Sequence, residues 1–167
     1  LLALGFGVAL GSQAGALMPA TDLAPITPGL GVEALALLAS AGAFVVLFQA
    51  RLRDAHLVVA GVVVAYVGAR MGAALMGPEL GAFLGALLVG LASSAVARLA
   101  DRPAQLALVP GVLMLVPGSL GFSSVRGMLR AETVQAVDAA FHTGIIAIAI
   151  VVGLLAAPAL LPPRRAL

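Results

Sequence analysis

The sequence contains no cysteine, no tryptophan and no lysine, and charged residues make up only 10% of its 167 positions. The absence of cysteine excludes a disulfide framework and a thiolate metal site, and two histidines are too few for a metal centre built from neighbouring residues. The net charge is only +2, whereas nucleic-acid binding requires a dense basic face. We therefore expect no metal, no cofactor and no nucleic-acid partner.

Apolar residues dominate what remains, at 62% of the chain with a mean hydropathy of +1.18. A soluble domain usually carries about a quarter charged residues, and nine arginines with seven acids cannot cover the surface of one. The composition predicts an all-α integral membrane protein whose outer surface faces lipid. Six charge-poor stretches are long enough to cross a bilayer as helices, at residues 1–21, 34–50, 55–78, 80–97, 103–125 and 139–163.

The arginine positions orient these expected helices, because basic residues in short loops stay on the cytoplasmic side. Three basic stretches should lie inside the cell, at 51–54, 98–102 and 164–165. Six crossings satisfy this pattern. The alternative makes residues 106–118 a re-entrant segment and sends the C-terminus outward.

Glycines recur at four-residue spacing, at Gly68 and Gly72 and again at Gly77, Gly81 and Gly85. Small residues at this interval let the backbones of membrane helices approach closely. The spacing therefore predicts helix packing. The alternative is that the second stripe forms a sliding surface for a rocking motion.

The motif Leu-Val-Pro-Gly occurs twice, at 108–111 and 115–118. Each proline removes a backbone donor and frees the carbonyl four residues earlier, so we expect these repeats to interrupt a helix inside the bilayer. Broken helices are typical of a transporter's substrate site, whereas a kinked helix with a polar end is the alternative. The candidate substrate-binding residues of this segment are Pro110, Gly111, Pro117, Gly118, Ser119, Ser123 and Arg126.

Four further ionisable residues lie near or inside the expected spans. Arg70 is either a substrate-binding residue or a side chain that extends to the headgroups. Asp138 and His142 share a helix face, and they either relay protons in a coupled cycle or form an N-terminal acid beside a hydrogen-bonded histidine. Glu33 opens the second stretch, and we expect it to be only a first-turn acid.

Several motifs together resemble the C-terminal half of the threonine/serine exporter family. They are the basic loop with Arg51 and Arg53, the Gly-Ala-Arg-Met-Gly run at 68–72 and the doubled Pro-Gly segment at 108–118. The resemblance implies a transporter half of about five spans over residues 33–165. Residues 1–20 look like the helix that closes a preceding membrane half, so we expect the chain to be one piece of a longer polypeptide.

The resemblance also implies a function and a set of partners. Members export threonine and serine from the bacterial cytoplasm through the inner membrane, driven by the proton gradient. Their second half lies in the same chain or in a separate subunit. We therefore expect a small polar substrate, an N-terminal transporter half, membrane lipid and, as an option, a second copy of this chain.

Two other functions stay open at this point. A split relative of the family is linked to succinate, so a dicarboxylate exporter is one alternative. The other is a scaffold that does not transport and stabilises a partner subunit through its glycine stripes. The sequence contains neither a nucleophile elbow nor a phosphate loop, so we do not expect an enzyme.

Overall fold

The computed structural model describes residues 29–99, 102–116 and 133–161, and these residues form helices without any strand. The helices are α2 (Leu30–Leu47), α3 (Ala55–Met76), α4 (Pro78–Leu99), α5 (Gln105–Leu115) and α7 (Thr133–Leu160). The expected all-helical fold is thus confirmed for this part of the chain. Within it, α3, α4 and residues 137–160 of α7 are long and apolar enough to cross a membrane, whereas α2 and α5 are shorter apolar helices. The expected count of six spans is therefore not confirmed.

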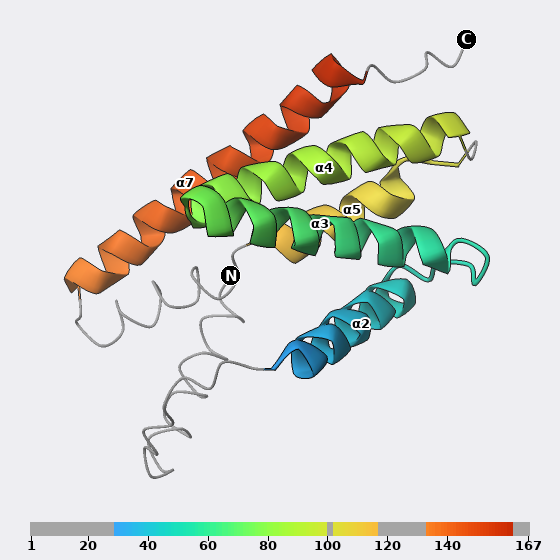
Figure 1. The fold of residues 1–167 in the computed structure, drawn as a ribbon, viewed down its shortest axis with the longest axis horizontal. Coiled ribbons are helices and arrows are strands. Elements are labelled where there is room, and N and C mark those ends of the chain that lie inside the picture. Colours follow the sequence, from blue (N-terminus) through green and yellow to red (C-terminus); the bar gives the residue numbers. More distant parts are fainter. Residues whose placement is uncertain (1–28, 100–101, 117–132, 162–167) are drawn as a thin grey trace, which may run out of the picture.

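Helices α3 and α4 lie side by side at the centre of the bundle (Figure 1). Helix α4 also packs against α5 and α7, and α3 packs against α5 and α2. Successive helices alternate in direction, so α2, α4 and α7 run one way and α3 and α5 run the other. This alternation brings residues that are distant in the sequence to the same end of the bundle.

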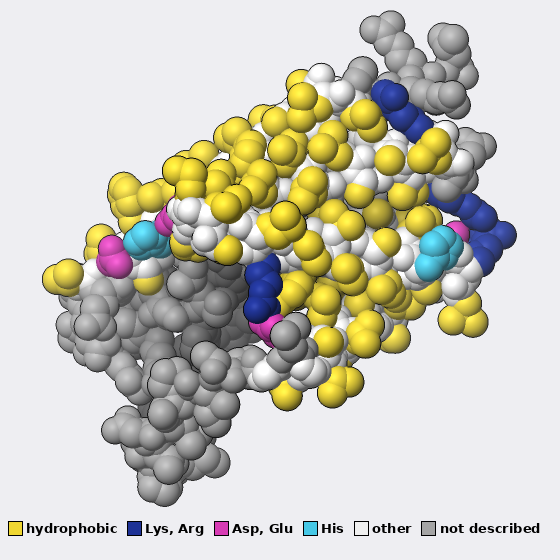
Figure 2. Space-filling view, in the orientation of Figure 1, with side chains coloured by type: hydrophobic (Ala, Val, Ile, Leu, Met, Phe, Trp, Pro, Cys, Tyr) yellow, Lys and Arg dark blue, Asp and Glu magenta, His cyan; other side chains and the backbone are white. Residues whose placement is uncertain are grey.

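The two ends of the bundle differ in charge. Arg51, Arg53, Arg98 and Arg102 gather at one end, which we call the arginine-rich end. The opposite end holds the start of α4 with Glu79 and the start of α7. Figure 2 shows hydrophobic side chains along the length of the bundle, as expected for a surface that faces acyl chains.

Paired glycines set the spacing between α3 and α4. A Cβ atom at Gly72 would lie 2.7 Å from the Cα of Gly81, and one at Gly68 would lie 2.9 Å from the Cα of Gly85. The predicted packing role is confirmed at these four positions. Gly77 differs from them because it ends α3 with a positive φ of 101°, a conformation that favours glycine, and so it belongs to the turn into α4.

Helices α4 and α7 approach each other as closely as α3 and α4 do. A Cβ atom at Gly153 would lie 2.5 Å from the carbonyl oxygen of Phe83, and one at Gly90 would overlap Ala157. The apolar core between them is formed by Ala82, Ala86, Ile146 and Ile150. Because these contacts bury small side chains, they hold α7 in one register along α4.

The first Pro-Gly repeat does not interrupt its helix. Helix α5 continues through Pro110 and ends at Leu115, so the interruption expected at the first repeat is wrong. Pro110 and Gly111 are both buried, and a Cβ atom at Gly111 would lie 2.9 Å from the carbonyl oxygen of Gly61 in α3. Pro110 cannot donate a helical hydrogen bond, and this close packing stabilises the helix where that bond is missing.

The helix ends at the second repeat. Val116 has an extended backbone with φ −61° and ψ 124°, which the residue before a proline favours. The 11 residues of α5 rise only about 16 Å, about half of the hydrocarbon thickness. The rest of the expected fifth span, residues 117–125, lies outside the described residues.

Candidate functional site

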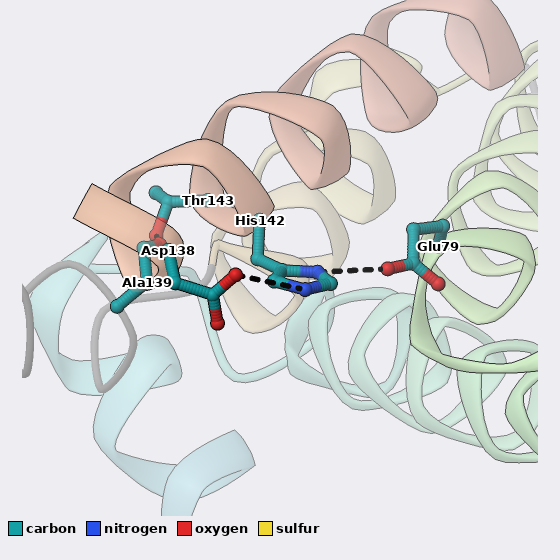
Figure 3. Close-up of polar contacts among 5 residues, drawn as sticks. All are labelled: Glu79, Asp138, Ala139, His142 and Thr143. Carbon is teal, nitrogen blue, oxygen red and sulfur yellow. Dashed lines mark hydrogen bonds and ion pairs between the residues drawn. The ribbon is translucent and has the colours of Figure 1, made fainter. Parts of the chain in front are cut away.

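At the end of the bundle opposite the arginines, His142 of α7 lies between two carboxylates (Figure 3). Its Nδ1 atom is 3.1 Å from Oε1 of Glu79 in α4, and its Nε2 atom is 4.0 Å from Oδ1 of Asp138, one turn earlier in α7. All three side chains are at least partly exposed. We call these three residues the acid–histidine cluster.

The two ring nitrogens of His142 face different carboxylates, so the cluster responds to the protonation of the imidazole. A neutral imidazole has a single N–H group. When Nδ1 carries it, this group donates to Glu79, and the lone pair of Nε2 faces Asp138. The protonated ring has donors at both nitrogens and places a positive charge between two negative ones.

Local structure explains how Glu79 reaches the cluster. Gly77 reverses the chain at the end of α3, and Pro78 begins α4 at the position where its missing N–H has no helical partner. Glu79 therefore lies in the first turn of α4. The close contact between α4 and α7 at Gly153 then sets the distance between Glu79 and His142.

A second group of polar side chains joins α2 to α3. Arg70 of α3 forms an ion pair with Glu33 of α2, and its Nη1 atom donates a hydrogen bond of 2.8 Å to the hydroxyl of Tyr66. The side chains of Arg70 and Glu33 are 56% and 29% exposed. We call these three residues the Arg70 cluster. The expectation that Glu33 is only a first-turn acid is therefore wrong.

Two members of the Arg70 cluster, Arg70 and Tyr66, lie inside the apolar helix α3, whereas Glu33 lies in the first turn of α2. Arg70 is followed by six residues of α3, so it is about 9 Å from the helix terminus, and Tyr66 is one turn deeper. Charged groups at this depth are costly in a bilayer and mark functional sites when they are paired. Glu33 supplies the partner that Arg70 needs there.

The arginine-rich end holds an ion pair between two connections. Asp54, which precedes α3, is 7% exposed, and its Oδ1 atom lies 3.2 Å from Nη1 of Arg102, which precedes α5. The Nε atom of Arg53 lies 3.7 Å from Oδ2 of the same carboxylate. This contact ties the turn between α2 and α3 to the connection between α4 and α5.

The remaining predicted site residues fall into two groups. Pro110 and Gly111 lie in α5, where they are buried against α3 and α4. The others lie outside the described residues, and they are Pro117, Gly118, Ser119, Ser123 and Arg126. Among the described residues, the structure brings Asp138 and His142 together, whereas Arg70 belongs to its own cluster.

Sequence reasoning missed Glu33, Tyr66 and Glu79 as members of these clusters. Tyr66 precedes Arg70 by four residues, so helical spacing alone could have paired them. Glu79 and His142 are 63 residues apart, and no local pattern links them. Their contact depends on how α4 and α7 pack.

Comparison with known proteins identifies a family. A family model described as "Threonine/Serine exporter, ThrE" matches residues 33–160, which is more than half of the chain. The match covers all the described helices apart from the first three residues of α2. Searches of curated proteins and of solved structures found no significant match.

Proposed function

The chain belongs to the threonine/serine exporter family, and we propose that it forms half of a secondary transporter that moves threonine and serine out of the bacterial cytoplasm. The family is one of transporters rather than enzymes, and the apolar helices agree with a multi-pass membrane protein. The match over residues 33–160 is the observation that carries this proposal.

We propose that export is coupled to protons through the acid–histidine cluster. Asp138 is 75% exposed and can exchange a proton with water, and His142 can accept that proton at Nε2. Glu79 then stabilises the charged ring from its other nitrogen. Because Glu79 and His142 belong to different helices, protonation strengthens the contact between α4 and α7, and loss of the proton weakens it.

The proposed substrate path follows the Pro-Gly segment and Arg70. Helix α5 ends within the thickness of the bundle, at the second repeat, which is the kind of helix end that transporters use near the substrate. Arg70 supplies a guanidinium for the substrate carboxylate. Pro117, Gly118, Ser119, Ser123 and Arg126 stay candidates for the main-chain and hydroxyl contacts.

The other half of the transporter is part of this proposal. An N-terminal half, in the same chain or in a separate subunit, would complete the path across the inner membrane. Large apolar side chains are exposed along α2 and can contact either this neighbour or lipid, and they include Val32, Leu35, Leu38 and Val46.

Efflux from loaded cells tests the proposal. Cells that express the protein and contain labelled threonine should lose the label faster than cells without it, and Pro117→Ala or Arg126→Ala should slow that loss at least about fivefold. Unchanged efflux in both variants would remove the Pro-Gly segment from the substrate site. Efflux of succinate but not of threonine would contradict the proposed cargo, and normal efflux by the partner alone would indicate a scaffold.

A further inference from the structure

The Arg70 cluster contains one positive and one negative group at the interface of α2 and α3. Glu33 and Arg70 form an ion pair, and the same Nη1 atom of Arg70 donates a hydrogen bond to the hydroxyl of Tyr66. The net charge of the cluster is zero. Both charged side chains are partly exposed, so a small molecule can reach them without the bundle being opened.

Helix stability does not account for this pair. A partly exposed ion pair contributes little to stability, because each charge loses solvation and side-chain freedom when the pair forms. An apolar pair at the same positions would suit a helix in hydrocarbon better. The retained charges therefore need a different explanation, and an ionisable group inside a span, as Arg70 is in α3, is by default a candidate functional site.

An amino acid carries the same two charges as the cluster, separated by one carbon atom. Its carboxylate matches a guanidinium, which binds carboxylates with two parallel hydrogen bonds. Its ammonium group has three donors and matches a carboxylate acceptor. A zwitterion placed between Arg70 and Glu33 would thus replace one ion pair with two.

We propose that Glu33, Arg70 and Tyr66 recognise the zwitterionic backbone of the exported amino acid. Arg70 binds the α-carboxylate, Glu33 binds the α-ammonium group, and Tyr66 holds the guanidinium in position through its hydroxyl. This assignment rests on the proposed export function and specifies which part of the substrate each side chain reads.

Charge balance makes the site selective for this class of substrate. A zwitterion leaves the net charge of the cluster at zero, so no unpaired charge is placed in the low-dielectric span. A dicarboxylate would bring two negative charges next to Glu33, and repulsion between like charges would oppose its binding. The site therefore favours amino acids over dicarboxylates such as succinate.

Competition experiments with full-length protein in membrane vesicles test the assignment. The uptake of labelled threonine is measured in the presence of three unlabelled competitors, and the inhibition gives the affinity for each. The competitors are threonine, 3-hydroxybutyrate, which lacks the ammonium group, and threoninol, which lacks the carboxylate. Glu33→Gln should lower the affinity for threonine at least about tenfold and should leave the affinity for 3-hydroxybutyrate unchanged or higher. Arg70→Gln should lower the affinity for threonine by a similar factor and should leave the affinity for threoninol unchanged. Tyr66→Phe should lower the affinity for threonine about fivefold.

Arg51→Gln is the matched control, because it removes an exposed arginine at the other end of the bundle and should leave all three ligands unaffected. Equal loss of all three ligands in Glu33→Gln and Arg70→Gln would overturn the assignment and indicate a structural role. Threonine affinity within twofold of the wild type would also overturn it while leaving the export function intact. Absence of threonine transport by the wild-type protein would instead overturn the export function on which the assignment rests.

Discussion

Nδ1 of His142 in α7 lies 3.1 Å from Oε1 of Glu79, a residue of α4 that stands 63 positions earlier in the sequence. The second ring nitrogen of His142 faces Asp138 at 4.0 Å. One imidazole ring thus contacts two carboxylates, one in its own helix and one in α4. The proposed proton coupling depends on this arrangement.

Replacing His142 with glutamine should flatten the pH dependence of threonine export. Glutamine keeps a polar side chain of similar length but cannot accept a proton, whereas an imidazole can. The initial efflux rate is measured across that range. His56→Gln is the control, because His56 is the other histidine of the chain and lies at the start of α3, at the arginine-rich end. A profile that changes in the His56 variant and not in the His142 variant would contradict the assignment.

The contact between Glu79 and His142 should appear in a double-mutant cycle. Glu79→Gln and His142→Gln should each slow export, and the double variant should be no slower than His142→Gln alone, because both substitutions remove the same contact. The expected coupling energy is about 1–3 kcal/mol. Efflux rates of the four proteins give this value. Fully additive effects would show that the two side chains act separately.

Gly72→Ala should destabilise the packing of α3 against α4. A Cβ atom at this position would lie 2.7 Å from both the Cα of Gly81 and the carbonyl oxygen of Leu80. Because these atoms belong to the backbone of α4, the helices must separate, at a cost of about 1–3 kcal/mol. Gly144→Ala is the matched control, since a Cβ atom at Gly144 would meet nothing within 4 Å. Thermal unfolding in detergent should show a lower midpoint only for Gly72→Ala.

Gln49→Gly should stabilise the turn after α2. Gln49 has a positive φ of 49°, a left-handed conformation that costs about 1 kcal/mol for a residue with a side chain and much less for glycine. The variant should therefore raise the unfolding midpoint, whereas Gln49→Ala should not. A lower midpoint for Gln49→Gly would mean that the glutamine side chain contributes a contact of its own.

The sequence predicted two of the helical spans well, because length and apolar composition determine them. The charge-poor stretches at 55–78 and 80–97 correspond closely to α3 and α4. The spacing of Gly68 and Gly72 also predicted a close helix contact, since small residues at this interval leave one groove open to a neighbouring backbone.

The predictions were weaker where tertiary packing decides the outcome. Pro110 was expected to interrupt a helix, but burial between α3 and α4 keeps α5 continuous across it. Gly77 was grouped with the packing stripe, although its positive φ makes it a turn residue. Neither result could be read from spacing alone.

The candidate site was predicted only in part for the same reason. The i,i+4 pair of Asp138 and His142 follows from helical geometry, so the sequence contained it. Glu33 and Glu79 meet their partners across helix interfaces, and their sequence context is only that of acids in the first turn of a helix.

Proton-coupled export is tested most directly by threonine efflux from loaded proteoliposomes under an imposed pH gradient. With an outer solution at about pH 6 and a neutral interior, the wild-type protein should release threonine several-fold faster than without the gradient. His142→Gln should remove this acceleration and His56→Gln should preserve it. Threonine release by the wild-type protein that does not respond to the gradient would contradict proton coupling at the acid–histidine cluster.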